Sequence, residues 1–206
     1  MPLLWQPVLA APAVQAGGKG AARTVLIVGD SLSAEYGLAR GSGWVALLEK
    51  RLADEKLAAT VVNASISGDT SSGGRSRLAA LLAQHKPTHV VIELGGNDAL
   101  RGLPLDMTRQ NLQAMTQAAQ AAGAKVLLVG MQVPPNYGAR YGQDFAALFA
   151  GVAQAQGAAL VPFLLAGVAD GPQAERLFQP DRIHPLAAAH PTMLANVWKV
   201  MKPWLR

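Results

Sequence analysis

Thr24-Val25-Leu26-Ile27-Val28-Gly29-Asp30-Ser31-Leu32-Ser33 is an apolar run that stops abruptly at Gly-Asp-Ser. The run has the length and the β-branched content of a buried strand, and Gly-Asp-Ser is turn chemistry. The pattern therefore delivers Ser31 to the C-terminal end of a strand, where open parallel α/β sheets bind their ligands. This position makes Ser31 a candidate nucleophile, although a serine after a strand can equally cap the next helix.

Strand-like and helix-like segments alternate along the rest of the chain. Four further apolar runs follow the first, at residues 60–64, 88–94, 125–129 and 158–162. Between and after these runs, apolar residues recur at helical spacing. Such alternation predicts parallel strands joined by right-handed crossovers, with helices on both faces of the sheet. We expect a flavodoxin-like three-layer α/β/α fold whose five-stranded parallel sheet has the order 2-1-3-4-5.

The predicted strand order locates a crevice. In this order the chain reverses direction between strands 1 and 3, so ligands are expected between the C-terminal ends of those two strands. Ser31 follows strand 1, strand 3 ends in Leu94-Gly95-Gly96-Asn97-Asp98, and Ser65-Ile66-Ser67-Gly68-Asp69-Thr70 follows strand 2. Three polar, glycine-bearing loops therefore converge on one place. Metal sites and phosphate cradles also use such loops, so the location does not name the chemistry.

A hydroxyl nucleophile needs a base, and His184 is the histidine best placed to supply one. It lies in the loop Pro180-Asp181-Arg182-Ile183-His184-Pro185 after the last strand, whereas the other three histidines occupy positions that favour structural roles. Pro185 biases His184 toward extended backbone, so the Asp181 carboxylate can reach Nδ1 and fix the tautomer. The alternative is a metal-ligand pair, which needs further ligands from the acidic residues of the convergent loops.

Candidate oxyanion donors lie in the same loops. The backbone N–H groups of Ser31 and Gly68 can supply two donors, and the Asn97 side-chain amide can supply a third. Gly-Gly-Asn-Asp is also an ordinary turn sequence, so Asn97 has a structural alternative. Neither G-x-S-x-G nor G-x-x-x-x-G-K-[ST] occurs in the chain, which argues against an α/β-hydrolase and against a P-loop nucleotide enzyme.

Composition excludes several classes of protein. The chain has 206 residues, 50% hydrophobic and 15% charged, which suffices for one substantial core and predicts one domain. Cysteine is absent, which excludes disulfides, thiolate metal sites and cysteine nucleophiles. The net charge of +5 favours anionic partners, but the basic residues are scattered without interleaved aromatics. We therefore expect no nucleic-acid partner.

The first 23 residues differ from the rest. They contain an apolar segment, residues 2–13, that is too short to span a membrane and ends in the small-x-small pattern Ala11-Pro12-Ala13. A Gly/Ala/Lys linker follows, and no Lys or Arg precedes Lys19. We interpret residues 1–23 as an export signal with its linker, which predicts a periplasmic or secreted protein. The alternative is an apolar tail on a cytoplasmic protein.

Four blocks in order resemble the GDSL or SGNH hydrolase family, and most of all its bacterial arylesterase, acyl-CoA thioesterase I and lysophospholipase group. The blocks are residues 29–33, 63–70, 95–98 and 181–185, and the likeness spans residues 24–204. It implies a hydrolase domain over residues 24–206, without a metal or other cofactor. By this resemblance Ser31 is the nucleophile, His184 the base and Asp181 its orienting acid. The oxyanion donors are then the N–H groups of Ser31 and Gly68 and the Asn97 side chain.

Three positions depart from the family pattern. Glu35 stands before Tyr36 where thioesterase relatives often have glycine, and Arg182 stands inside the Asp-x-x-His turn where glycine is common. His190-Pro191 replaces what is often Gln-Pro. No catalytic block is lost, and the departures leave the substrate preference open.

These features predict a serine esterase that hydrolyses short- to medium-chain carboxylic esters through an acyl-enzyme, with aryl esters, thioesters or lysophospholipids as substrates. The alternatives are a carbohydrate O-acetyl esterase and a non-catalytic, flavodoxin-like ligand-binding module. We expect small-molecule substrates and transient contact with lipid, and the sequence specifies no oligomeric state. Apolar residues of the loops around the crevice are candidates for an acyl groove, or for ordinary loop packing. They are Leu32, Tyr36, Leu100, Met131, Val133, Pro134, Tyr137 and Ile183.

Overall fold

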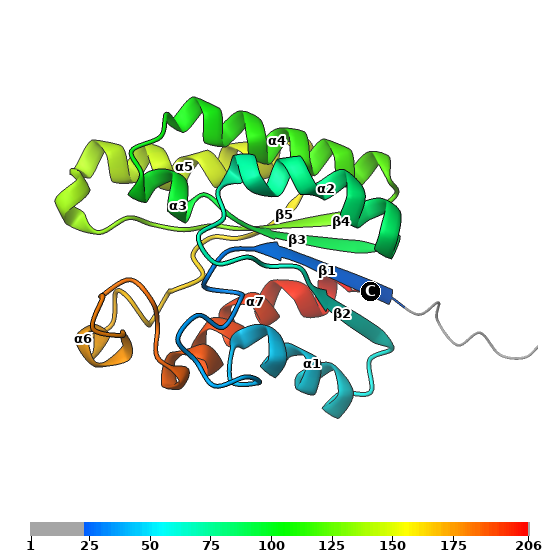
Figure 1. Ribbon diagram of the computed structural model, residues 1–206, viewed down its shortest axis with the longest axis horizontal. Helices are drawn as coiled ribbons and strands as arrows, with labels where there is room; N and C mark the ends of the chain where they lie inside the picture. The colour runs from blue at the N-terminus through cyan, green and yellow to red at the C-terminus, as the bar shows by residue number, and fades with distance from the viewer. Residues whose placement is uncertain (1–22, 206) are drawn as a thin grey trace, which may run out of the picture.

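The computed structural model describes residues 23–205. Five parallel strands form one sheet in the order β2-β1-β3-β4-β5 (Figure 1). The strands are β1 Arg23–Gly29, β2 Ala59–Asn63, β3 His89–Glu93, β4 Lys125–Val129 and β5 Ala159–Val161. The predicted parallel sheet and its strand order are confirmed, and the ends of the expected runs agree closely with the observed strands.

Helices cover both faces of the sheet. Figure 1 shows α2, α4 and α5 on one face, and α1 and α7 on the other, which is the predicted three-layer arrangement. The helices are α1 Trp44–Asp54, α2 Ser71–His85, α3 Gly96–Leu100, α4 Leu105–Ala121, α5 Ala139–Gln156, α6 Ala174–Leu177 and α7 His190–Trp204. Two 3-10 turns, η1 Pro135–Tyr137 and η2 Ala187–Ala189, precede α5 and α7.

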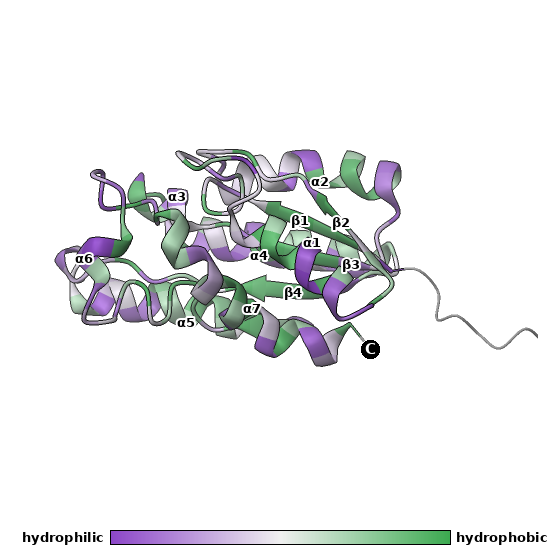
Figure 2. Cartoon of the chain, turned by 90° about the horizontal axis from the view of Figure 1, so that it is seen from below, coloured by the Kyte–Doolittle hydropathy of each residue, from purple (hydrophilic) through white to green (hydrophobic). Residues whose placement is uncertain are grey.

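Burial explains why the central strands appear as continuous apolar runs. Residues 25–28 of β1 and all five residues of β3 are buried, because helices pack on both sides of these strands. The edge strand β2 has no fully buried residue. Figure 2 shows the same separation, with hydrophobic residues in the strands and hydrophilic residues along the outer sides of the helices.

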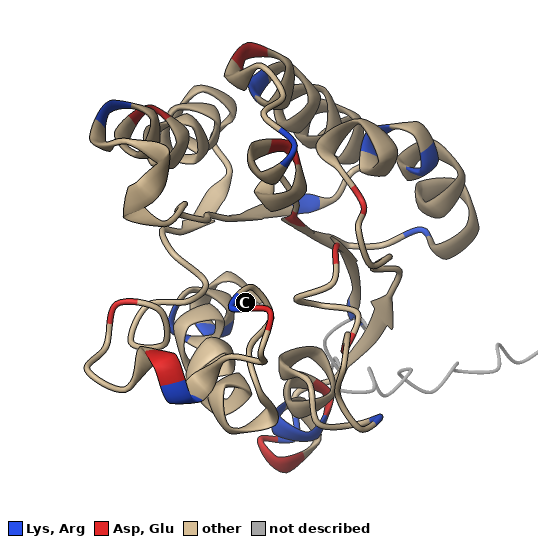
Figure 3. Cartoon of the chain, turned by 60° about the vertical axis from the view of Figure 1, so that its left-hand side comes forward, with Lys and Arg blue, Asp and Glu red and all other residues tan. Residues whose placement is uncertain are grey.

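The loops that follow β1, β2 and β3 leave the sheet at the same edge. In the parallel register Ile27 pairs with Asn63 of β2, and Gly29 pairs with Glu93 of β3. The three strands therefore end close to the same level, and the loops that follow them start side by side. Figure 3 brings this edge of the molecule forward, with acidic residues (red) in several of its loops.

The export signal and linker predicted for residues 1–23 lie outside the described residues, apart from Arg23, which begins β1. A periplasmic or secreted location therefore stays a prediction. Between residues 23 and 205, no helix is both long enough and apolar enough to cross a membrane.

Candidate active site

Ser31, His184 and Asp181 form a continuous chain of hydrogen bonds. Ser31 Oγ lies 2.9 Å from His184 Nε2, and His184 Nδ1 lies 2.7 Å from Asp181 Oδ2. The serine and the histidine are 153 positions apart in the sequence, and the fold joins them at the C-terminal edge of the sheet. When Nδ1–H is donated to the carboxylate, Nε2 is left as the acceptor for the Ser31 proton. This is the arrangement that a general base requires.

The loop that carries His184 is organised by Asp181. Oδ1 of Asp181 accepts hydrogen bonds from the backbone N–H groups of Ile183 at 2.9 Å and His184 at 3.0 Å, while Oδ2 faces the imidazole. Burial on its own would raise the pKa of the Asp181 carboxyl. The hydrogen bonds from His184 and Ile183 outweigh burial and lower this pKa to about 2. Asp181 is therefore ionised throughout the neutral pH range.

Ser31 begins a tight turn directly after β1. The Asp30 carbonyl accepts hydrogen bonds from Ser33 N at 3.2 Å and Ala34 N at 2.9 Å. The Asp30 carboxylate accepts a third from Leu32 N at 3.0 Å. These bonds fix the Gly-Asp-Ser turn from both sides of the nucleophile. Ser31 itself is 9% exposed, so it is sheltered but remains open to a substrate.

Two of the three predicted oxyanion donors are unpaired. Within residues 23–205, neither the Ser31 N–H nor the Gly68 N–H donates to a protein acceptor. Gly68 has φ +78°, in the left-handed region that favours glycine, and its carbonyl accepts a hydrogen bond from Arg101 Nη2 at 2.8 Å. Arg101 thus holds the Gly68 loop while the N–H group stays available to a substrate oxygen.

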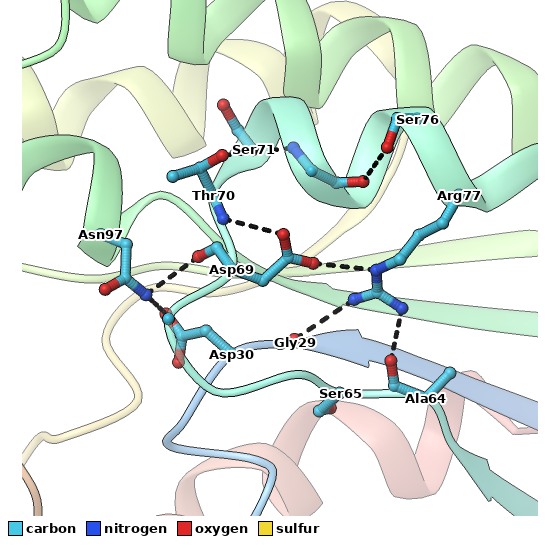
Figure 4. A network of polar contacts seen from close by, with 12 residues as sticks. Gly29, Asp30, Ala64, Ser65, Asp69, Thr70, Ser71, Ser76, Arg77 and Asn97 are labelled. Atoms are coloured by element: carbon cyan, nitrogen blue, oxygen red, sulfur yellow. Dashed lines mark hydrogen bonds and ion pairs between the residues drawn. The ribbon is translucent and has the colours of Figure 1, made fainter.

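The third predicted donor, Asn97, is already paired. Its Nδ2 donates to Asp30 Oδ2 at 3.0 Å and to the Asp69 carbonyl at 2.9 Å (Figure 4). Because both N–H groups of the amide are used, Asn97 donates to a substrate oxygen only by sharing or exchanging one of these bonds. The structure brings Asn97 beside Asp30 and Asp69, and its role as an oxyanion donor stays a prediction. The sequence gave no sign of this competition.

The other acidic residues of the convergent loops have protein partners. Asp69 forms an ion pair of 2.8 Å with Arg77, drawn in Figure 4, and lies at the entry to α2. Asp98 is fully buried and accepts hydrogen bonds from Ser71 N at 2.8 Å and Thr108 Oγ1 at 3.1 Å. In the part of the chain that the structure describes, no three His, Asp or Glu side chains gather as a metal ion would require.

Three of the predicted groove residues are exposed side chains that follow β1 or β3 or lie in the His184 loop. The exposed fractions are 50% for Tyr36 and 43% for both Leu100 and Ile183. The Tyr36 ring centroid lies 4.3 Å from that of His184, at an interplanar angle of 39°. Tyr36 therefore forms a wall beside the imidazole, and Ile183 precedes His184 in the chain.

The other five predicted groove residues are buried or follow β4. Leu32 and Met131 are each 7% exposed and belong to the hydrophobic core, so their burial assigns them to packing. Val133, Pro134 and Tyr137 lie in the segment between β4 and α5, where Val133 packs against the core and Pro134 is exposed. Their contact with substrate stays a prediction.

Gln179 is a site residue that the sequence did not reveal. Its backbone N–H donates to the His184 carbonyl at 2.8 Å. Its Nε2 donates to the Tyr36 carbonyl at 3.0 Å and to the Pro185 carbonyl at 3.3 Å. Gln179 therefore ties the His184 loop to the loop that follows Ser31. A lone glutamine between two loops has no pattern that could have marked it.

Trp44 and His190 make a second link between these regions. His190 Nδ1 accepts a hydrogen bond from Trp44 N at 2.9 Å, at the start of α1. The Trp44 indole donates to Ser33 Oγ at 3.2 Å. His190 is 2% exposed, and its contacts agree with the structural role expected from the sequence. Trp44 is also fully buried in the hydrophobic core, so its backbone and indole N–H groups link the core to these loops.

Comparison with known protein families identifies the family to which the chain belongs. Residues 27–191 match the GDSL-like Lipase/Acylhydrolase family. The chain belongs to this family. The resemblance inferred from four short sequence blocks is thereby confirmed.

Relatives within the GDSL family cover nearly the whole chain. Esterase TesA of Pseudomonas aeruginosa is 56% identical over 187 residues, 91% of this chain and 92% of TesA. Thioesterase 1/protease 1/lysophospholipase L1 of Escherichia coli K12 is 43% identical over 183 residues, 89% of this chain and 85% of that protein. A crystal structure of TesA, 56% identical, matches with a TM-score of 0.85 over 89% of this chain and 100% of that one.

Glu35 and Arg182, which stand where relatives often have glycine, share an unusual backbone conformation. Glu35 has φ +60° and Arg182 has φ +58°, both in the left-handed region where glycine is the favoured residue. The Glu35 carboxylate accepts hydrogen bonds from Gly41 N at 3.0 Å and Gly43 N at 2.7 Å, which offset part of the backbone cost. The Glu35 carboxylate therefore stabilises the loop before α1.

Proposed function

We propose that the chain is a serine esterase that hydrolyses short- to medium-chain carboxylic esters, including aryl esters, through an acyl-enzyme. Thioesters and lysophospholipids belong to the same proposal. The observation that carries it is the unbroken series of hydrogen bonds from Ser31 Oγ through His184 to Asp181. The names of the relatives, an esterase and a thioesterase that is also called a lysophospholipase, support the same class of reaction.

In the first half of the reaction, His184 Nε2 takes the proton of Ser31 Oγ as this oxygen attacks the acyl carbonyl carbon. The N–H groups of Ser31 and Gly68 donate to the carbonyl oxygen as it becomes negative. The ionised Asp181 stabilises the imidazolium, which then gives its proton to the departing alcohol or thiol. In the second half, His184 activates a water molecule that attacks the acyl-enzyme, and Ser31 leaves with its proton restored.

Exposed apolar side chains near the site support an apolar acyl group. The large apolar side chains that the described part of the chain leaves exposed are Tyr36, Ile66, Leu100, Ile183 and Leu186. They follow β1, β2 and β3 or lie in the His184 loop, so they occupy the edge of the sheet that carries Ser31. Such a rim favours acyl chains over sugar hydroxyls and suits transient contact with lipid.

A series of p-nitrophenyl esters of increasing acyl length tests the proposed substrate class. We expect kcat/KM to reach its maximum with a short or medium chain longer than acetyl, because the exposed apolar residues gain contact with each added methylene. The same preparation is then assayed with acyl-CoA and lysophospholipid. An optimum at acetate alone would favour a carbohydrate O-acetyl esterase. Failure to turn over any ester would favour a non-catalytic binding module.

The Asn97→Ala variant tests the third oxyanion donor. We expect kcat for the best p-nitrophenyl ester to fall by about 10²-fold, the usual loss for one such donor. Asn196→Ala is a matched control, because the Asn196 amide also donates two bonds, to the carbonyls of Leu164 and Ala166, away from the loops that carry Ser31. If the two variants lose kcat equally, Asn97 has only a structural role.

A further inference from the structure

Glu93 is a buried carboxyl group that the proposed reaction does not use. It ends β3 beside Gly29 of β1 and is 0% exposed. Its Oε2 accepts a hydrogen bond from Ser33 Oγ at 2.7 Å and a longer one from Asp30 N at 3.4 Å. Its Oε1 is also buried and has no hydrogen-bond partner among residues 23–205. An ionised Glu93 would leave this oxygen without a donor, which is costly.

Asp30 is a second buried carboxyl group next to Glu93, and it is 3% exposed. Its Oδ1 accepts a hydrogen bond from Leu32 N and its Oδ2 accepts one from Asn97 Nδ2, both at 3.0 Å. Within the described residues, neither Asp30 nor Glu93 forms a salt bridge. Two neighbouring buried carboxyl groups without a paired cation cannot both ionise cheaply, and Asp30 has the better donors for a charged form.

We propose that Glu93 is a positioning residue that keeps its proton at neutral pH and donates it in a hydrogen bond to Asp30, which carries the pair's single negative charge. Electrostatics agrees with this assignment. Burial raises the pKa of Glu93 well above its usual value, and the charge of Asp30 raises it further. Burial also raises the pKa of Asp30, to about 6, so that this second carboxyl is ionised at neutral pH.

The other charged groups around the pair come from three elements. His184, from the loop before α7, favours the ionised form of Asp30, whereas Asp69, from the loop before α2, opposes it. Arg77 of α2 pairs with Asp69 and donates to the Gly29 carbonyl at 3.4 Å. Arg77 thus largely compensates the Asp69 charge. His184 is the catalytic residue whose charge interacts with that of Asp30.

The proposed esterase reaction favours one negative charge, and not two, on the Asp30–Glu93 pair. This part of the inference rests on the proposed function. The Asp30 carboxylate accepts a hydrogen bond from the Asn97 amide at 3.0 Å, and a positive charge on His184 lowers the pKa of Asp30. A second negative charge on Glu93 would oppose the oxyanion that forms on the substrate at Ser31. Neutral Glu93 still accepts the Ser33 hydroxyl and thereby holds the turn that presents the nucleophile.

Infrared spectroscopy at neutral pH tests the protonation state directly. The wild-type protein is expected to show the C=O stretch of a protonated carboxylic acid. The band is expected to vanish in Glu93→Gln, and to persist in Asp30→Asn and in Glu49→Gln, whose side chain is exposed on α1. Absence of the band from the wild type, its survival in Glu93→Gln or its loss in Asp30→Asn overturns the proposal. These readings do not depend on turnover, so they stand apart from a failure of the proposed esterase function.

Kinetics tests the positioning role. Glu93→Leu removes the acceptor of Ser33 Oγ and is expected to lower kcat by about 10²-fold through displacement of the Ser31 turn. Glu93→Gln offers a neutral group of the same shape, which accepts from Ser33 and donates to Asp30. It is expected to recover most of the lost kcat, whereas a requirement for a negative charge at Glu93 predicts equal losses in both variants. If Glu93→Leu does not fold, a drop of 10²-fold or more in Glu93→Gln alone overturns the proposal.

Discussion

Replacing Ser31 by alanine is expected to lower kcat for a p-nitrophenyl ester by on the order of 10⁴-fold or more, with the fold retained. The expectation follows from the contact of 2.9 Å between Ser31 Oγ and His184 Nε2. The nearby Ser33 cannot take over, because its Oγ donates to Glu93 and accepts from the Trp44 indole. Steady-state kinetics measures the loss, and circular dichroism with a thermal melt checks that the variant is folded.

Ser76→Ala is the matched control for this experiment. Ser76 is an exposed serine of α2, and among the described residues its Oγ bonds only the Gly73 carbonyl of the same helix. We expect the Ser76→Ala variant to keep full activity. We also expect an organophosphonate to label this variant and the wild type, but not Ser31→Ala. Turnover by Ser31→Ala at a tenth or more of the wild-type rate would remove Ser31 from the mechanism.

The fold could be predicted because each strand leaves a direct mark in the sequence. Residues 25–28 and the run that forms β3 are apolar throughout, since helices cover both faces of these strands. The strand order then fixes which loops meet, so the sequence alone predicts that Ser31, Gly68 and Asn97 lie at one edge of the sheet. The Asp-x-x-His spacing was short enough to specify the contact between Asp181 and His184 locally.

Other features of the site could not be predicted, because they depend on contacts between remote segments. Gln179 donates to the backbone carbonyl of Tyr36, 143 positions away, and such a side-chain-to-backbone contact leaves no periodic or compositional pattern. Leu32 and Met131 show a different difficulty. Their apolar character indicates that they are buried, but the sequence does not show whether a substrate or the protein's own core buries them. In the structure they are buried in the core.

Asp181→Asn carries the second large expected effect, a fall in kcat of about 10⁴-fold, because the variant stabilises the wrong tautomer of His184. An asparagine oxygen can still accept the N–H groups of Ile183 and His184, as Asp181 Oδ1 does, and its NH₂ group then faces Nδ1. Nδ1 becomes an acceptor, Nε2 carries the proton, and the imidazole can no longer take a proton from Ser31. The loop geometry is retained, so the loss is expected in kcat, with KM little changed.

The pH dependence of kcat gives a second test of this tautomer effect. Hydrogen bonds from His184 and Ile183 overcome the opposing effect of burial and lower the pKa of Asp181 to about 2. The wild-type carboxylate thus stays ionised wherever the enzyme is assayed, and its stabilising contribution is lost only as the pH falls below about 4 and through 2. Between pH 5 and pH 9 we therefore expect Asp181→Asn to be impaired at every pH. The exposed control Asp54→Asn, at the end of α1, is expected to match the wild type throughout. Recovery of wild-type kcat by Asp181→Asn at any pH in this range would show that orientation of the imidazole does not depend on the carboxylate.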